Sequence, residues 1–198
     1  VVVYEPEVKL LKLTYTNSKT GEKKDVTELD EEFQEAEKSV KPFQWILDPE
    51  PMKKQMAIAL QRHKEQQARA KGRYKPILFV ITMSIAEGEK AQKMLQERFK
   101  INTLLVTEES DEKDREEALK IGSFDSKYEA VVSVLMLREG WDVPEVSTIL
   151  LLRKFSSPVY GQQIIGRGLR KNIRDKPEAE ILCVVDHPKF ELGFTFGV

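Results

Sequence analysis

The chain has 198 residues, a formal net charge of −1, 40% hydrophobic residues and 33% charged residues. A chain of this length and composition can bury a sizeable core, so we expect one folded domain with an appendage. Its apolar runs are all shorter than the roughly 20 residues of a membrane-spanning helix, and we therefore expect no membrane partner. The single cysteine, Cys183, excludes an internal disulfide framework and suits the reducing cytoplasm.

The N-terminal segment, residues 1–45, is predicted to be an accessory or connecting element. Within residues 1–27, an alternating apolar and polar run precedes turn-forming residues, and this pattern indicates a hairpin. A short acidic helix is expected over Glu28–Val40. The chain starts at Val1 without a signal peptide or an initiating methionine, which suggests a fragment of a longer protein.

A long helix is expected next, at the start of a second predicted domain, residues 46–198. Asp48 followed by Pro49 is typical of a helix start, because Asp caps the first turn and Pro is tolerated there. The helix should end near Gly72. His63 lacks an accompanying metal-ligand pattern, so we expect it at the surface. The predicted packing face comprises Met52, Met56, Ile58, Ala59 and Leu60.

From Pro76 onward, short apolar strands alternate with charged helices. Continuous Val, Ile and Leu runs in this alternation predict an α/β fold, with a mainly parallel sheet covered by helices on both faces. The predicted strands are Ile77–Thr82, Thr103–Thr107, Tyr128–Leu135, Ser147–Leu152 and Glu180–Asp186. The predicted helices are Ala86–Phe99, Asp111–Ile121 and Val159–Lys171.

Polar residues stand at the ends of several predicted strands. Thr82 and Ser84 close the first strand, Thr107 closes the second, and Arg138–Asp142 and Arg153–Ser157 follow the next two. In parallel sheets of this kind, ligands bind beyond the carboxyl ends of the strands. The functional site is therefore predicted at one edge of the sheet.

The last predicted helix carries a polar stripe. Gln163, Arg167 and Arg170 are spaced i, i+4 and i+7, which places them on one side of a helix. Two guanidinium groups and an amide suit a polyphosphate, because arginine offers fixed multi-donor geometry to phosphate oxygens. A solvated basic helix is the alternative interpretation. Gly166, which costs helix stability, favours the phosphate interpretation.

Several common site motifs are absent from the sequence. It contains no G-x-x-x-x-G-K-[ST] phosphate loop and no G-x-G-x-x-G between a strand and a helix, which disfavours a self-contained nucleotide-binding enzyme. It also lacks a Ser-His-Asp set and a cluster with metal-ligand spacing, so no metal site is predicted.

The chain resembles the second, C-terminal RecA-like domain of superfamily 2 DEAD/DEAH-type helicases and translocases. Leu137–Val146 resembles motif V of that superfamily, and Ile77–Thr82 with Ser84 resembles motif IV. Gln163–Arg170 matches the Q-x-x-G-R-x-x-R form of motif VI at every fixed position. The resemblance covers residues of about 49–186, and it implies a RecA-like, P-loop NTPase-like fold.

The resemblance also implies roles for the matching residues. Arg167 and Arg170 would be arginine fingers, and Gln163 would lie near the γ-phosphate of ATP held by a first RecA-like domain of the same polypeptide. That first domain would also supply most ligands of Mg²⁺. Nucleotide-edge residues would be Gly140, Asp142 and Gly166. Residues facing the nucleic-acid backbone would be Thr82, Ser84, Thr107 and Ser133.

Within the superfamily, the R-E-G-W-D-x-P and G-R-G-L-R sequences most resemble motor subunits of type III or type I restriction enzymes. This resemblance implies an endonuclease subunit that binds DNA, with RNA left open, and that acts with a modification or specificity subunit. The isolated fragment would be inactive. One alternative is an excision-repair-type helicase-like subunit, and another is a non-catalytic nucleic-acid-binding module that kept the fold.

Overall fold

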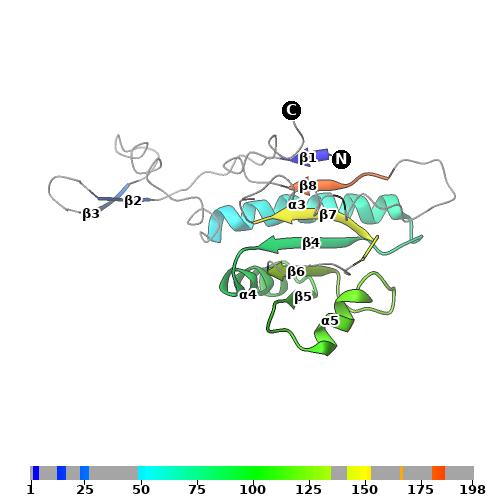
Figure 1. The fold of residues 1–198 in the computed structure, drawn as a ribbon. Coiled ribbons are helices and arrows are strands. Elements are labelled where there is room, and N and C mark those ends of the chain that lie inside the picture. Colours follow the sequence, from blue (N-terminus) through cyan, green and yellow to red (C-terminus); the bar gives the residue numbers. More distant parts are fainter. Residues whose placement is uncertain are drawn as a thin grey trace.

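The computed structural model describes residues 2–4, 13–16, 23–26, 49–134, 142–152, 166 and 180–185. The main feature of these residues is a six-stranded sheet with the order β1-β8-β7-β4-β6-β5, in which all neighbouring strands are parallel (Figure 1). The strands are β1 (Val2–Tyr4), β4 (Ile77–Thr82), β5 (Thr103–Val106), β6 (Ala130–Val134), β7 (Val146–Leu151) and β8 (Cys183–Val185).

The predicted α/β fold with a mainly parallel sheet is confirmed. β4 has the predicted bounds, whereas β5, β6 and β8 are shorter than predicted and β7 is shifted by one residue. Every residue of β4, β6 and β7 is buried. Continuous burial of this kind arises because parallel strands between two helical layers expose neither face to solvent, which is why their sequences are continuously apolar.

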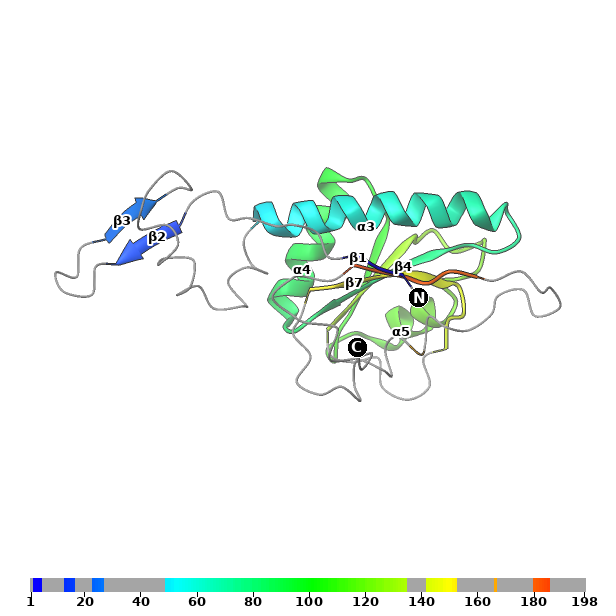
Figure 2. The same ribbon diagram turned by 90° about the horizontal axis from the view of Figure 1, so that it is seen from above.

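Helices cover both faces of the sheet. Phe79 and Ile81 of β4 belong to a core that includes α5 (Glu112–Leu119). Leu78 and Val80, which alternate with them, belong to a second core that includes α3 (Pro49–Ala70) and α4 (Ile85–Lys93). Figure 2 shows α3 and α4 on one side of the sheet and α5 on the other. Because successive side chains of a strand point to opposite faces of the sheet, one apolar run contributes to two cores.

The packing face predicted for α3 is confirmed, but the prediction that His63 lies at the surface is wrong. The His63 side chain is only 2% exposed. Its position follows from spacing, because the buried residues of α3 recur at three- and four-residue intervals and residue 63 falls on that stripe. The stripe consists of Met52, Gln55, Met56, Ala59, Leu60, His63, Gln66 and Ala70.

A glycine brings α4 close to the sheet. A Cβ added at Gly88 would lie 2.7 Å from Cγ2 of Val134 and 2.9 Å from Cδ1 of Leu105, which is closer than carbon atoms pack. The helix predicted over Ala86–Phe99 is present as α4 followed by the π-helical turn η1 (Met94–Arg98), and it ends one residue earlier than predicted. The absence of a side chain at Gly88 therefore sets the distance between α4 and the ends of β5 and β6.

The N-terminal segment contributes to two sheets. β2 (Leu13–Thr16) and β3 (Lys23–Val26) form an antiparallel pair, as the predicted hairpin requires. β1 instead pairs in parallel with β8 at the edge of the main sheet, a position that the sequence did not indicate. The helix predicted over residues 28–40 lies outside the described residues. The helix predicted over residues 159–171 is described at Gly166 alone, which is helical.

Lys75 stabilises the loop between α5 and β6, at the amino end of the sheet, through hydrogen bonds. Its Nζ donates hydrogen bonds to the carbonyl oxygens of Ser126 at 2.6 Å, Ser123 at 3.3 Å and Ile121 at 3.4 Å. Burial lowers the pKa of the Lys75 ammonium, and the nearby Glu129 opposes that effect. The loop between α5 and β6 is thus held by one cation that precedes β4.

Replacing Lys75 with methionine is expected to lower the free energy of unfolding by about 1–2 kcal/mol, because three carbonyl groups lose a charged donor. Urea unfolding followed by circular dichroism measures this loss. Lys120→Met is the matched control, since Lys120 is 72% exposed and its Nζ lies 3.5 Å from Glu116. An equal loss in the two variants would show that the loop contacts contribute nothing specific.

Candidate functional site at the carboxyl edge of the sheet

The register of the parallel strands brings several predicted site residues to one edge. Thr82, the last residue of β4, pairs with Val134, the last residue of β6. Ser133 of β6 pairs with Val106, the last residue of β5, and Thr107 follows directly. Thr82, Ser133 and Thr107 therefore lie at or near the carboxyl ends of three adjacent strands, a position that the sequence predicted for Thr82 and Thr107.

Thr82 lies beneath α4. Its side chain is 0% exposed, and its Oγ1 donates a long hydrogen bond of 3.5 Å to the carbonyl oxygen of Ser84. Its Oγ1 also lies 3.4 Å from the position that a Cβ at Gly88 would take. The close approach of α4 thus covers Thr82 and leaves its hydroxyl bonded within the chain.

Ser84 is exposed and caps α4. Its Oγ accepts a hydrogen bond from the N–H of Glu87 at 3.3 Å. The Glu87 carboxylate accepts from the backbone N–H groups of Met83 at 2.8 Å and Ser84 at 3.2 Å. This reciprocal pattern is a capping box, which explains why a serine and a glutamate stand three positions apart at the helix start.

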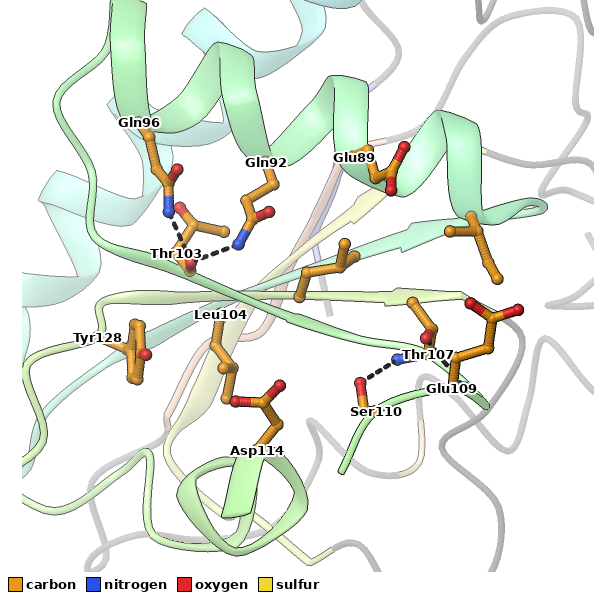
Figure 3. A pocket seen from close by; sticks show the side chains of 12 residues that line it. Glu89, Gln92, Gln96, Thr103, Leu104, Thr107, Glu109, Ser110, Asp114 and Tyr128 are labelled. Atoms are coloured by element: carbon orange, nitrogen blue, oxygen red, sulfur yellow. Dashed lines mark hydrogen bonds between the residues drawn. The ribbon is translucent and has the colours of Figure 1, made fainter. Parts of the chain in front are cut away.

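Thr107 begins a tight turn after β5. Its N–H donates to Oγ of Ser110 at 2.9 Å, and its Oγ1 accepts from the N–H of Glu109 at 3.1 Å (Figure 3). Thr107 is 6% exposed. The turn after β5 is therefore stabilised by the side chains of Thr107 and Ser110.

The four residues predicted to face nucleic acid do not share one surface. Ser133 is 2% exposed and alternates with Val132 and Val134, so its side chain points to the α5 face of the sheet. Thr82 points to the α4 face. Of the four, Ser84 alone is exposed.

Two of the predicted nucleotide residues lie within the described residues. Asp142 is exposed and shortly precedes β7, and the adjacent Val143 is buried in the core on the α5 face. Gly166 is exposed and helical, with no atom within 4 Å of the place where a Cβ would stand. The predicted residues Gly140, Gln163, Arg167 and Arg170 lie outside the described residues.

The structure also contains a groove that the sequence did not predict. It has a volume of about 410 Å³ and runs along β5 between α4 and α5 (Figure 3). Nε2 of Gln92 and Nε2 of Gln96 each donate to the Thr103 carbonyl oxygen at 3.0 Å. The charged residues among its described lining are all acidic: Glu89, Glu109 and Asp114. An acidic run at 108–117 is visible in the sequence, but the contribution of α4 depends on the fold.

Comparison with known families identifies the domain. Residues 53–172 match the model of the helicase conserved C-terminal domain, a span of more than half of the chain. The chain belongs to this family. The matched span includes the carboxyl edge described above and the sequence Gln163–Arg170.

Several solved structures are similar to this helicase C-terminal domain. Domain 2 of the DEAD-box helicase Mss116p, solved with an RNA duplex, has a TM-score of 0.50 at 16% identity, over 71% of this chain and 52% of that chain. The E. coli DEAD-box protein SrmB, solved with regulator of ribonuclease activity A, has a TM-score of 0.49 at 16% identity, over 69% of this chain and 78% of that chain. T4 UvsW has a TM-score of 0.46 at 20% identity, over 67% and 25%.

The likeness to the Mss116p domain supports the RecA-like fold alone, since the identity is low. The helicase C-terminal domain described here spans about half of that Mss116p chain. A comparison with curated proteins gave no match. Among the described residues, no helix is both long and apolar enough to cross a membrane, and no group of three His, Cys, Asp or Glu side chains could hold a metal ion.

Proposed function

We propose that this domain is one half of an ATP-driven nucleic-acid motor, with the first RecA-like domain of the same polypeptide as the other half. The observation that carries the proposal is the family match over residues 53–172. This span includes both the carboxyl edge of the sheet and the predicted polar stripe of Gln163, Arg167 and Arg170. ATP would supply the free energy for movement through hydrolysis of its terminal phosphoryl group. The phosphate loop and the main Mg²⁺ ligands belong to the first domain in this proposal.

Arg167 and Arg170 are proposed to reach across the interface between the two domains. Guanidinium groups delivered in this way stabilise the charge that develops during phosphoryl transfer, and such a finger contributes about 10³–10⁵ in rate. Gln163, on the same side of the proposed helix, would bind near the terminal phosphate. Because these contacts require the closed arrangement of two domains, they would couple the nucleotide state to the opening and closing of the motor.

Gly140, Asp142 and Gly166 are proposed to complete the nucleotide edge. The two of them that the structure describes fit this role, because Asp142 and Gly166 are exposed. The open space around Gly166 would also allow a ligand or a partner domain to approach the backbone closely. Asp142 would accept hydrogen bonds from the ribose hydroxyl groups.

Ser84 is the proposed nucleic-acid contact that needs no rearrangement, because the residue is exposed at the carboxyl edge. Thr82, Thr107 and Ser133 remain in the proposed set, but they are buried, so the elements that cover them would have to move before a nucleic-acid strand could touch their side chains. Contacts to the backbone alone suit a motor that moves along any sequence.

The proposed substrate is DNA, and the proposed parent protein is the motor subunit of a restriction enzyme with a modification or specificity subunit as its partner. The R-E-G-W-D-x-P and G-R-G-L-R sequences support this choice. An excision-repair-type subunit is the alternative, with a similar R-E-G-x-D-x-P stretch. The Mss116p domain was solved with an RNA duplex, so the substrate test must include RNA.

ATP hydrolysis by the full-length protein tests the proposal. We expect turnover to rise when double-stranded DNA is added, and to rise less with RNA of the same length. Nucleic-acid binding that is independent of ATP, with no turnover in the full-length protein, would instead support a non-catalytic module.

Replacing Ser84 with aspartate is expected to weaken nucleic-acid binding about tenfold at low salt, because a carboxylate would repel the phosphate backbone. Aspartate is as good a helix cap as serine, so stability should change little. Fluorescence anisotropy with a labelled duplex measures the affinity. Ser123→Asp adds the same charge in the exposed loop held by Lys75, at the amino end of the sheet, and should leave affinity unchanged. Equal effects would remove Ser84 from the contact set.

A further inference from the structure

The outer side of β5 presents backbone groups to the acidic groove. In a parallel strand the N–H and C=O of one residue point to the same side, and successive residues alternate. The Asn102 carbonyl oxygen accepts from the N–H of Ala130 at 3.2 Å, so Asn102, Leu104 and Val106 face β6. Thr103 and Leu105 therefore direct their backbone groups outward, where the described residues provide no further strand.

Side chains of the chain itself bond backbone groups at both ends of this edge. Gln92 and Gln96 donate to the carbonyl oxygen of Thr103, and Ser110 accepts from the N–H of Thr107. Leu105 lies between Thr103 and Thr107 on the same outer side of β5, and no described residue forms a hydrogen bond with its outward backbone groups. The groove thus contains a short pairing position, closed at each end by polar side chains.

The charges around this position select among possible occupants. Glu89 projects from α4, Asp114 from α5 and Glu109 from the turn after β5 (Figure 3). Three carboxylates disfavour a phosphate backbone, and pairing with a second copy of this chain would bring three more carboxylates into the same space. Both nucleic acid and self-association are therefore disfavoured in the groove.

A cationic peptide strand fits the same arrangement. Successive side chains of an extended peptide point to opposite sides, so adjacent basic residues would reach toward α4 and toward α5. Carboxylates stand on both of these sides, at Glu89 and Asp114. Strand addition supplies backbone hydrogen bonds, while the flanking side chains supply specificity.

We propose that the groove along β5 binds an extended, lysine- or arginine-rich segment of a partner protein, which pairs with Leu105 and places its cations against Glu89, Glu109 and Asp114. This inference goes beyond the proposed motor function. Its test uses the 198-residue chain without ATP, so its failure would leave the motor proposal unaffected.

The probe is a fluorescein-labelled ten-residue peptide of threonines with four adjacent lysines at its centre, and fluorescence anisotropy measures its binding. A peptide with glutamates in place of the lysines is the charge control. We expect the lysine peptide to bind, its affinity to fall with added salt, and the glutamate peptide not to bind. Two further lysine peptides, N-methylated on either the odd or the even residues, test strand pairing. At least one of the two methylated peptides should lose binding, because methylation removes the backbone N–H groups that would donate hydrogen bonds to β5.

The groove variant combines Glu89→Gln, Glu109→Gln and Asp114→Asn. The control variant combines Glu97→Gln, Glu112→Gln and Glu116→Gln, exposed acids outside the groove lining, and changes the net charge equally. We expect the groove variant to bind the lysine peptide about tenfold more weakly and the control variant to match the unaltered chain, with both folded by circular dichroism. Equal losses in both variants, or full binding by both methylated peptides, would overturn the proposal. A labelled single-stranded oligonucleotide that binds more tightly than the lysine peptide, and loses affinity in the groove variant, would also overturn it.

Discussion

Replacing Arg167 or Arg170 with alanine is expected to lower nucleic-acid-stimulated ATP turnover by the full-length protein about 10³-fold or more. The physical reason is that a guanidinium group delivered across an interface neutralises charge that appears on the transferring phosphoryl group in the transition state. The group binds the ground state less strongly, so affinities for ATP and DNA should change much less than turnover. Steady-state hydrolysis, with separate equilibrium binding of a labelled nucleotide and a labelled duplex, measures both quantities.

Two further variants make this result specific. Arg167→Lys keeps the charge but loses the planar, multi-donor geometry, so it should recover only part of the lost turnover. Arg98→Ala removes an exposed guanidinium at the end of η1, outside the stripe, and should leave turnover unchanged. Unchanged turnover in both alanine variants of the stripe would mean that Arg167 and Arg170 lie on a solvated face. The motor mechanism would then fail, although the family membership of the chain would stand.

The sheet was predictable because one physical constraint acts on whole strands. Parallel strands between helical layers are buried on both faces, so β4, β6 and β7 consist of uninterrupted apolar or small residues that are visible without a structure. β1 was not predictable in this way. Its three residues pair with β8. A segment that short has no recognisable hydrophobic pattern, so the sequence cannot distinguish a strand of the main sheet from a loop.

The sequence predicted where the candidate site lies along the chain, but it did not predict which of its side chains are buried and which are exposed. Residues at strand ends meet at one edge because of parallel topology, which places Thr82 and Thr107 at that edge as predicted, with Ser133 near them. Their burial depends on tertiary contacts: the approach of α4 through Gly88 covers Thr82, whereas Ser133 lies on the α5 face of the sheet. The acidic groove likewise combines side chains from α4, α5 and a turn, and no single stretch of sequence records their proximity.

His63 illustrates how position on a helix can outweigh the polarity of a side chain, and it has a consequence for stability. The ring lies on the buried stripe of α3, its Nδ1 has no hydrogen-bond partner within the described part of the chain, and its Nε2 lies 3.3 Å from Nε2 of Gln67. Burial lowers the pKa of His63 from 6.5 to about 4. The folded protein therefore holds a neutral imidazole at pH values where the unfolded chain is protonated.

The stability of the chain is expected to fall as the pH decreases from 6.5 to about 4, because the unfolded state binds a proton at His63 that the folded state does not. Above this range both states are neutral, and below it both are protonated, so His63 contributes no further pH dependence. Each pKa unit corresponds to about 1.4 kcal/mol, which gives an expected loss of roughly 2–3 kcal/mol between pH 7 and pH 4.5.

Urea unfolding of the unaltered chain and of His63→Leu at both pH values isolates this contribution, since carboxylates elsewhere titrate equally in the two proteins. Leucine cannot be protonated and suits the apolar stripe, so the stability of the variant relative to the unaltered chain should improve by the same roughly 2–3 kcal/mol as the pH falls. A stability difference that stays constant with pH would show that His63 is protonated in the folded state. The imidazole ring would then have to be solvated or paired with an acceptor, which would contradict its position on the buried face of α3.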